Sequence, residues 1–192
     1  MELARLPCRC RLAPPWAVDM TILLTMGDAA GIGPEIIARA FVRGAAEGCV
    51  VVGDLGVMRR AMALLPDPWP TAQLESPVDS APPRCLPVWQ PEGLPPALDR
   101  LAWGAVDARA GQAAALCIEA AVRAVQRGEG GAIVTAPIHK AALAAAGVPY
   151  PGHTEMLQAL AGGMQVRMML ANDELRVVLV TIHQSLRTAI DA

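Results

Sequence analysis

The segment 21–41 constrains the fold of this chain more than any other part of its sequence. A run of strand-forming residues at 21–25 leads into a glycine-rich turn at 27–33, and Pro34 follows directly. Proline suits the first position of a helix because its φ is already helical and no N–H is needed there. A strand, a glycine turn and a helix in succession open an α/β domain, so we predict an α/β fold.

The rest of the chain continues the alternation of strands and helices. Buried strands are predicted at 49–52 and 131–135, and helices at 55–65, 108–127, 139–146 and 154–160. Ten of the 17 prolines lie between Pro66 and Pro96, which excludes a helix and predicts a surface connection with one edge strand near 85–89. Apolar runs at 164–170 and 175–181 predict a β-hairpin around Asn172 and Asp173, and 184–192 resembles the start of a helix.

The composition is that of a folded globular protein, with 54% hydrophobic and 18% charged residues among 192. A net charge of −2 without a long run of one sign argues against a nucleic-acid or membrane-surface partner. No apolar run reaches the ~18 residues that a membrane-spanning helix needs. The five cysteines form no C-x-x-C pair, which argues against zinc-ribbon and disulfide scaffolds and predicts reduced, mostly buried thiols in the cytoplasm.

Residues 1–19 differ in character from the rest of the chain. They contain Arg5, Arg9 and Arg11 and the Pro14-Pro15 pair, but no continuous apolar stretch of the kind that a secretory signal requires. An organelle transit peptide is the alternative. Because Met20 stands directly before the first predicted strand, we predict that 1–19 is an unstructured extension and that 20–192 is the α/β portion.

Four short segments could carry chemistry, and the first two follow predicted strands. The turn at 27–33 places Asp28, Gly31 and Gly33 where backbone N–H groups and a helix N-terminus can meet an anion, although a tight strand-to-helix turn would have the same sequence. It lacks the lysine of a Walker A loop and the spacing of the dinucleotide fingerprint. His139 and Lys140 follow a later strand, where ligands gather in open α/β sheets; a solvated loop is the alternative.

The other two segments contain the remaining histidines. Thr154 can cap a helix, and His153 would then point from the helix start into a neighbouring cleft; the alternative is a capped helix with an exposed histidine. His183 directly follows a predicted strand, and neutral imidazole binds transition metals, although a lone histidine is more often structural. We predict that His153, Thr154 and His183 line one groove on the same side of the sheet.

Four segments in register resemble the 4-hydroxythreonine-4-phosphate dehydrogenase (PdxA) family. They are 27–35 (GDAAGIGPE), 135–140 (TAPIHK), 147–155 (GVPYPGHTE) and 168–192 (MMLANDELRVVLVTIHQSLRTAIDA). Order and spacing agree from about residue 21 to the last residue, and the resemblance is to the N-terminal portion of the family. It implies a lobe like those of the isocitrate and isopropylmalate dehydrogenases, truncated before the second half, and a homodimer in the full-length protein.

The resemblance also implies an activity and site residues. The expected reaction is oxidation, with decarboxylation, of 4-phosphohydroxy-L-threonine in pyridoxal 5'-phosphate (vitamin B6) biosynthesis. The implied cofactors are NAD or NADP and a divalent metal (Zn, Mg, Mn or Co) that acts as a Lewis acid. By position, His153 and Thr154 match the family's substrate-binding pair, and His183 matches the first of its three metal-binding histidines. No residue is matched to a catalytic role.

The chain departs from the family pattern at three places, with Ala29 for proline, Ala136 for glycine and Gln184-Ser185 for Leu-Pro. These departures leave the fold in place but open the substrate to another phosphorylated hydroxy acid, such as threonate or erythronate phosphate, or to a dihydrodiol. An α/β ligand-binding remnant without catalysis is the alternative from a different class. Because the other metal ligands and most of the cofactor site lie downstream in the family, we predict that this chain alone is inactive.

Overall fold

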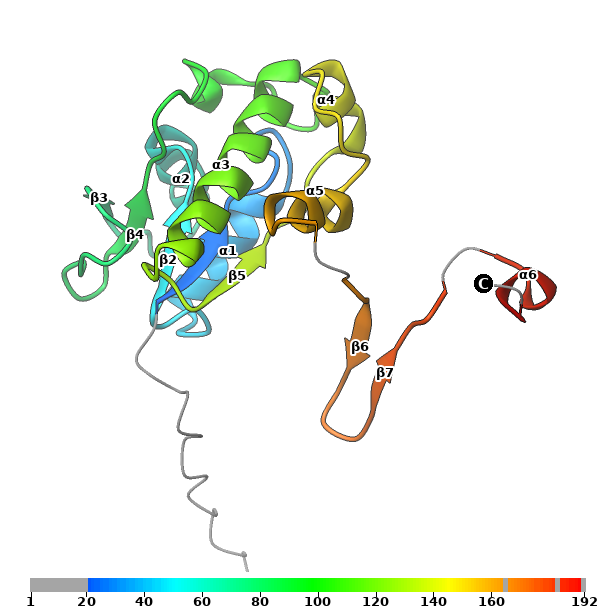
Figure 1. Ribbon diagram of the computed structural model, residues 1–192. Coiled ribbons are helices and arrows are strands. Elements are labelled where there is room, and N and C mark those ends of the chain that lie inside the picture. The colour runs from blue at the N-terminus through cyan, green and yellow to red at the C-terminus, as the bar shows by residue number, and fades with distance from the viewer. Residues whose placement is uncertain (1–20, 164–165, 182–183, 191–192) are drawn as a thin grey trace, which may run out of the picture. The chain divides into compact units, whose positions relative to one another are not determined.

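The computed structural model describes residues 21–163, 166–181 and 184–190 (Figure 1). The chain divides into two compact units, the first ending at Val148 and the second beginning at Pro149, and each is considered by itself. The predicted extension at 1–19 and the candidate metal ligand His183 lie outside the described residues. No helix of the described part is long and apolar enough to cross a membrane.

A five-stranded parallel sheet forms the centre of the first unit. Its strands are β1 (Ile22–Thr25), β2 (Cys49–Val52), β3 (Thr71–Leu74), β4 (Leu86–Trp89) and β5 (Ala132–Thr135), in the order β3-β4-β2-β1-β5. β1 lies between β2 and β5, with Leu23 opposite Val50 and Ile133. Leu23 and Val51 are fully buried, as expected for inner strands of a parallel sheet that is covered on both faces.

Helices cover both faces of this sheet. α1 (Gly33–Val42) and α2 (Leu55–Met62) follow β1 and β2 and pack against each other, and α2 also contacts β3 and β4. α3 (Ala108–Gln126) precedes β5 and packs on β1, β2 and β5. The chain moves along the sheet in one direction from β1 to β2 and in the other from β4 to β5. Because parallel crossovers are right-handed, α3 lies on the face opposite α1 and α2 (Figure 1).

Local sequence sets the ends of these helices. Asp54 caps α2 by accepting a hydrogen bond from the Val57 N–H at 2.7 Å, and α3 ends before Gly128, which has a φ of +79°. The buried face of α3 consists mainly of small residues, which lets its backbone approach α4 (Lys140–Ala145) closely. A short 3₁₀ helix, Leu98–Arg100, lies against α2 in the connection before α3.

The second unit contains α5 (His153–Leu160), the strands β6 (Met169–Ala171) and β7 (Arg176–Val178), and α6 (Leu186–Ile190). β6 and β7 form the predicted antiparallel hairpin. Asn172 makes its turn by accepting hydrogen bonds at Oδ1 from the N–H groups of Glu174 (3.0 Å) and Leu175 (2.6 Å). The predicted hairpin and C-terminal helix are therefore confirmed, although both strands are shorter than their apolar runs.

The predicted edge strand near 85–89 is wrong in its position. β4 lies inside the sheet, and the edge is β3, which the proline-rich composition of this region concealed. The pairing around Pro87 explains how an inner strand tolerates proline. The N–H of Leu86 donates to the Pro70 carbonyl at 2.8 Å, on the β3 side, so the nitrogen of Pro87 faces β2, and the ladder to β2 begins only at Val88. Pro87 thus stands where no N–H is required for either ladder.

Two burial predictions also need correction. The strand at 131–135 was predicted to be buried, but β5 has a neighbour on one side only within the described sheet, and Val134 is 47% exposed. The cysteines were predicted to be mostly buried. Of the described cysteines, Cys117 is buried, whereas Cys49 and Cys85 are half-buried, and all three are free thiols; Cys8 and Cys10 lie outside the described residues.

Candidate functional site

The carboxyl ends of β1 and β5 carry two of the four predicted segments. β1 continues through the glycine turn into α1, and β5 continues through 136–139 into α4. Because α4 packs against α3, on the face opposite α1, the two connections leave the sheet edge in opposite directions. Such a switch point is where open α/β sheets bind ligands, so the first unit has its candidate site here.

The two segments are in direct contact at this edge. The N–H of Asp28 donates to the carbonyl of Pro137 at 3.0 Å, and the N–H of Ala136 donates to the carbonyl of Thr25 at 3.2 Å. Gly27 has a φ of +71°, and a Cβ there would collide with the Pro137 carbonyl. The glycine at this position therefore serves the close approach of two chain segments as well as the turn itself.

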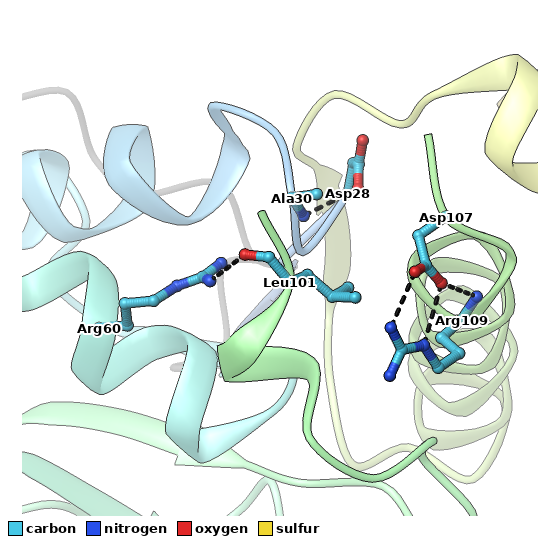
Figure 2. A network of polar contacts seen from close by, with 6 residues as sticks. All are labelled: Asp28, Ala30, Arg60, Leu101, Asp107 and Arg109. Atoms are coloured by element: carbon cyan, nitrogen blue, oxygen red, sulfur yellow. Dashed lines mark hydrogen bonds and ion pairs between the residues drawn. The ribbon is translucent and has the colours of Figure 1, made fainter. Parts of the chain in front are cut away.

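The carboxylate of Asp28 orders the turn from within. The residue is only 5% exposed, and its Oδ1 accepts a hydrogen bond from the N–H of Ala30 at 2.9 Å. The second carboxylate oxygen points away from Ala30 (Figure 2). The backbone carbonyl of Asp28 accepts from the N–H of Gly31 at 3.0 Å. Asp28 thus holds the turn through Oδ1 and its backbone carbonyl, while Oδ2 would lie 3.3 Å from a Cβ placed on Gly31.

The two later glycines of the turn are explained mainly by packing. A Cβ on Gly33 would lie 2.5 Å from the Met26 carbonyl oxygen and 3.2 Å from the Ala136 Cβ, and one on Gly31 would lie 3.2 Å from the Asp28 Cβ. These distances support the tight-turn interpretation of the segment. Among the described residues no side chain caps α1, so the N–H groups at its start stay available to an anion.

His139 and Lys140 stand at the start of α4. The Nδ1 atom of His139 accepts a hydrogen bond from the N–H of Ala142 at 3.4 Å, so this histidine is the N-cap of the helix. Both side chains are exposed. His139 therefore uses one ring nitrogen to hold α4 and has the other, together with the Lys140 ammonium, left for a ligand or for solvent.

His153 and Thr154 form the first turn of α5 in the second unit. Gly152, not Thr154, is the N-cap, and no side chain of the described residues caps this helix. The predicted cap is wrong because the helix begins one residue earlier than its sequence pattern suggested. His153 is half-buried, and among the described atoms its buried Nε2 has no hydrogen-bond partner. Burial lowers the pKa of His153 and so favours neutral imidazole.

This burial makes the stability of the second unit depend on pH. The folded pKa of His153 lies below its ordinary value of 6.5, so the unfolded chain takes up a proton first as the pH falls. Stability is therefore complete above that value and decreases below it. We expect α5 to lose protection from hydrogen exchange as the pH falls below about 6.5. The variant His153→Gln should weaken this pH dependence, and the matched control His139→Gln should leave it unchanged. If the parent shows no pH dependence of protection in α5, the lowered pKa of His153 is contradicted.

The described residues contain no complete metal site. Among the described residues no group of three His, Cys, Asp or Glu side chains is placed to hold a metal ion. The candidate ligand His183 lies outside the described residues, so its predicted grouping with His153 and Thr154 stays a prediction. Structural and catalytic transition-metal sites in proteins use about three or four protein ligands.

A cavity of about 640 Å³ lies at the opposite edge of the sheet, where the strands begin. Thr21, Cys49 and Cys85 line it, together with Trp69 and Arg84, and it contains none of the four predicted segments. Parallel sheets bind ligands at the other edge, beyond the carboxyl ends of their strands. The candidate site is therefore assigned to the switch point and not to this cavity.

The sequence and the fold are similar to those of known dehydrogenases. A family model described as pyridoxal phosphate biosynthetic protein PdxA matches residues 45–192. The chain is 44% identical to a 4-hydroxythreonine-4-phosphate dehydrogenase from Beijerinckia indica, over 90% of this chain and 51% of the relative. It is 40% identical to a D-threonate 4-phosphate dehydrogenase from Pectobacterium atrosepticum, over 88% and 53%.

A crystal structure of a 4-hydroxythreonine-4-phosphate dehydrogenase from Klebsiella pneumoniae has the same fold. It superposes with a TM-score of 0.80 at 38% identity and covers 90% of this chain and 53% of its own. The chain thus spans about half the length of the relatives that it matches. The α/β fold predicted from the sequence is confirmed, and the parallel sheet of the structure agrees with this relative.

Proposed function

This chain belongs to the PdxA family, and from that membership we propose that it supplies part of the active site of an NAD- or NADP-dependent dehydrogenase. The proposed substrate is 4-phosphohydroxy-L-threonine, oxidised in the biosynthesis of pyridoxal 5'-phosphate. The observation that carries the proposal is the meeting of two family-like segments, 27–33 and 135–140, at the sheet's switch point. A lobe of the isocitrate dehydrogenase type and a full-length homodimer are parts of the same proposal.

D-threonate 4-phosphate is the second candidate substrate. A relative of that name is 40% identical to this chain, close to the 44% of the relative named for hydroxythreonine phosphate. The two substrates share the phosphate and the secondary alcohol and differ in an amino group against a hydroxyl. Because the two substrates share the groups that the family-like segments would bind, the preference for one substrate over the other has to be measured.

The residues of this chain have the chemistry for binding a phosphorylated hydroxy acid. A neutral His153 can donate or accept a hydrogen bond at a hydroxyl, and burial favours that neutral form. Thr154 is exposed in the first turn of α5, where N–H groups favour an anion. Lys140 is exposed at the carboxyl edge of the first unit and can offset phosphate charge there.

The proposed cofactors need more residues than this chain shows. A nicotinamide, when bound, accepts the hydride from the alcohol carbon, and a divalent metal polarises oxygen. His183 is the proposed ligand from this chain. Since the described residues contain no further set of ligands, we derive no step through the metal. We propose that the remaining ligands come from the half of the relatives that this chain does not span.

Joining 21–192 to the remaining half of the Beijerinckia indica relative tests the substrate. We expect NADH formation with 4-phosphohydroxy-L-threonine, at a kcat/KM at least about tenfold above that for D-threonate 4-phosphate. A higher kcat/KM for D-threonate 4-phosphate would make it the proposed substrate in place of 4-phosphohydroxy-L-threonine. The relative's own full-length enzyme is the matched control, and a folded chimera without turnover on either substrate contradicts the proposal.

A further inference from the structure

The guanidinium of Arg60, on α2, joins three segments of the first unit. Its Nη1 donates to the carbonyls of Asp99 and Leu101, at 2.7 Å each, and its Nη2 donates to the carbonyl of Ala29 at 2.8 Å. Figure 2 shows the bond to Leu101 beside the turn that contains Asp28 and Ala30. One side chain thus connects α2, the connection before α3 and the glycine turn.

The same connection holds the turn at a second point. The N–H of Gly104 donates to the carbonyl of Ala30 at 2.8 Å, and the ring of Trp103 covers the Arg60 guanidinium, with 3.8 Å between its Cζ atom and the ring centroid. Two consecutive carbonyls of the turn are therefore fixed, that of Ala29 by Arg60 and that of Ala30 by Gly104. The turn is also held by the hydrogen bond from the N–H of Asp28 to the Pro137 carbonyl.

The geometry requires arginine. Three carbonyls, two from the connection before α3 and one from the glycine turn, accept from one planar fork, which a lysine ammonium on a single stem cannot match. Burial lowers the pKa of Arg60, while Asp99 and Asp54 act in the opposite direction. Within the described structure its buried Nε has no partner, so the side chain gives up one hydrogen bond to reach the other three. Arg59, its exposed neighbour, donates to the Thr71 hydroxyl at 3.0 Å and makes no bond to the glycine turn among the described residues.

We infer that Arg60 is a positioning residue, which holds the glycine turn at the carboxyl edge in the conformation that presents the start of α1 to a ligand. Its bond to Ala29 holds the turn one residue after the hydrogen bond from Asp28 to Pro137. That a ligand binds at this turn rests on the proposed function. That Arg60 orders the turn rests only on the contacts described above.

Amide hydrogen exchange of the 192-residue chain tests this inference, with Arg60→Met, Arg60→Lys and the matched control Arg59→Met. In the parent the N–H groups of Asp28, Ala30 and Gly31 are hydrogen-bonded and should exchange slowly. We expect Arg60→Met to accelerate exchange at 27–33 and 98–104 by about tenfold or more, with α3 unchanged. Arg60→Lys should restore part of the protection, and Arg59→Met should match the parent.

Two results would overturn the inference: exchange in α3 accelerated as much as in the turn, or a turn unaffected by Arg60→Met. Adding NAD as a probe to the chimera that carries the other half of the relative, and to its Arg60→Met and Arg59→Met forms, separates the inference from the proposed function. If NAD protects the turn of the parent chimera, and this protection is lost in Arg60→Met but kept in Arg59→Met, both the inference and the proposed function are supported. A parent turn that NAD does not protect counts against cofactor binding here, while the comparison of variants still decides the role of Arg60.

Discussion

Gly27→Ala is expected to lower the free energy of unfolding by about 2–4 kcal/mol. Two effects add at this residue. Its φ of +71° is unfavourable for any residue with a Cβ, and that Cβ would meet the Pro137 carbonyl. Because the colliding atom belongs to the backbone, no rotamer change can relieve the contact. The turn and the segment after β5 would have to separate, which would break the hydrogen bond between Asp28 and Pro137.

Gly44→Ala is the matched control. Gly44 has a φ of +73°, and a Cβ there would have no atom within 4 Å. Only the conformational cost applies, so the expected loss is about 1 kcal/mol. Urea unfolding of both variants isolates the contact between the two segments as the difference. Equal losses would contradict the close approach of Gly27 and Pro137 and with it the architecture of the site.

Gly111→Ala is expected to destabilise the protein although it lies inside α3, where alanine is ordinarily the better residue. The gain in helix propensity is about 1 kcal/mol. Against it, the new Cβ would collide with the Ala142 carbonyl and lie 2.7 Å from the Leu143 nitrogen. Since this is backbone of α4, the helices must move apart, and a net loss of about 1–3 kcal/mol is expected. The movement would also displace His139 from the carboxyl edge.

Gln112→Ala, one residue further along α3, gives the comparison. Gln112 is exposed, so its replacement should change the unfolding free energy by no more than about 0.5 kcal/mol. Thermal and urea unfolding of the two variants measure the difference. If Gly111→Ala raised the stability, α3 and α4 would not be in backbone contact, and the position of the segment 135–140 would need revision.

The parts of the fold that could be predicted from the sequence have local causes. The glycine turn and Pro34 predicted the start of α1, Asn172 predicted the hairpin turn, and the predicted helix 108–127 ends directly before Gly128, as α3 does. Each of these signals acts within a few residues of the element that it defines. For the same reason, helix ends were predicted only to within a residue or more, as the N-cap at Gly152 in place of Thr154 shows.

What could not be predicted depends on contacts between distant residues. The inner position of β4 follows from its pairing with both β2 and β3, which no local pattern encodes. Arg60 had no motif, because its partners are backbone carbonyls that any residue can offer. The contact of 27–33 with 135–140 was not predicted: each segment was placed after its own strand, and the order of strands makes the two segments neighbours.

The central claim is that this chain supplies part of a dehydrogenase site that requires the other half of the family's length. NADH formation from 4-phosphohydroxy-L-threonine, with NAD and a divalent metal, tests it most directly when the chimera is compared with the 192-residue chain alone. We predict turnover by the chimera that is abolished by a chelator and by His183→Ala, and no turnover by the chain alone. Turnover by the chain alone, or turnover by the chimera that survives His183→Ala, would contradict the account.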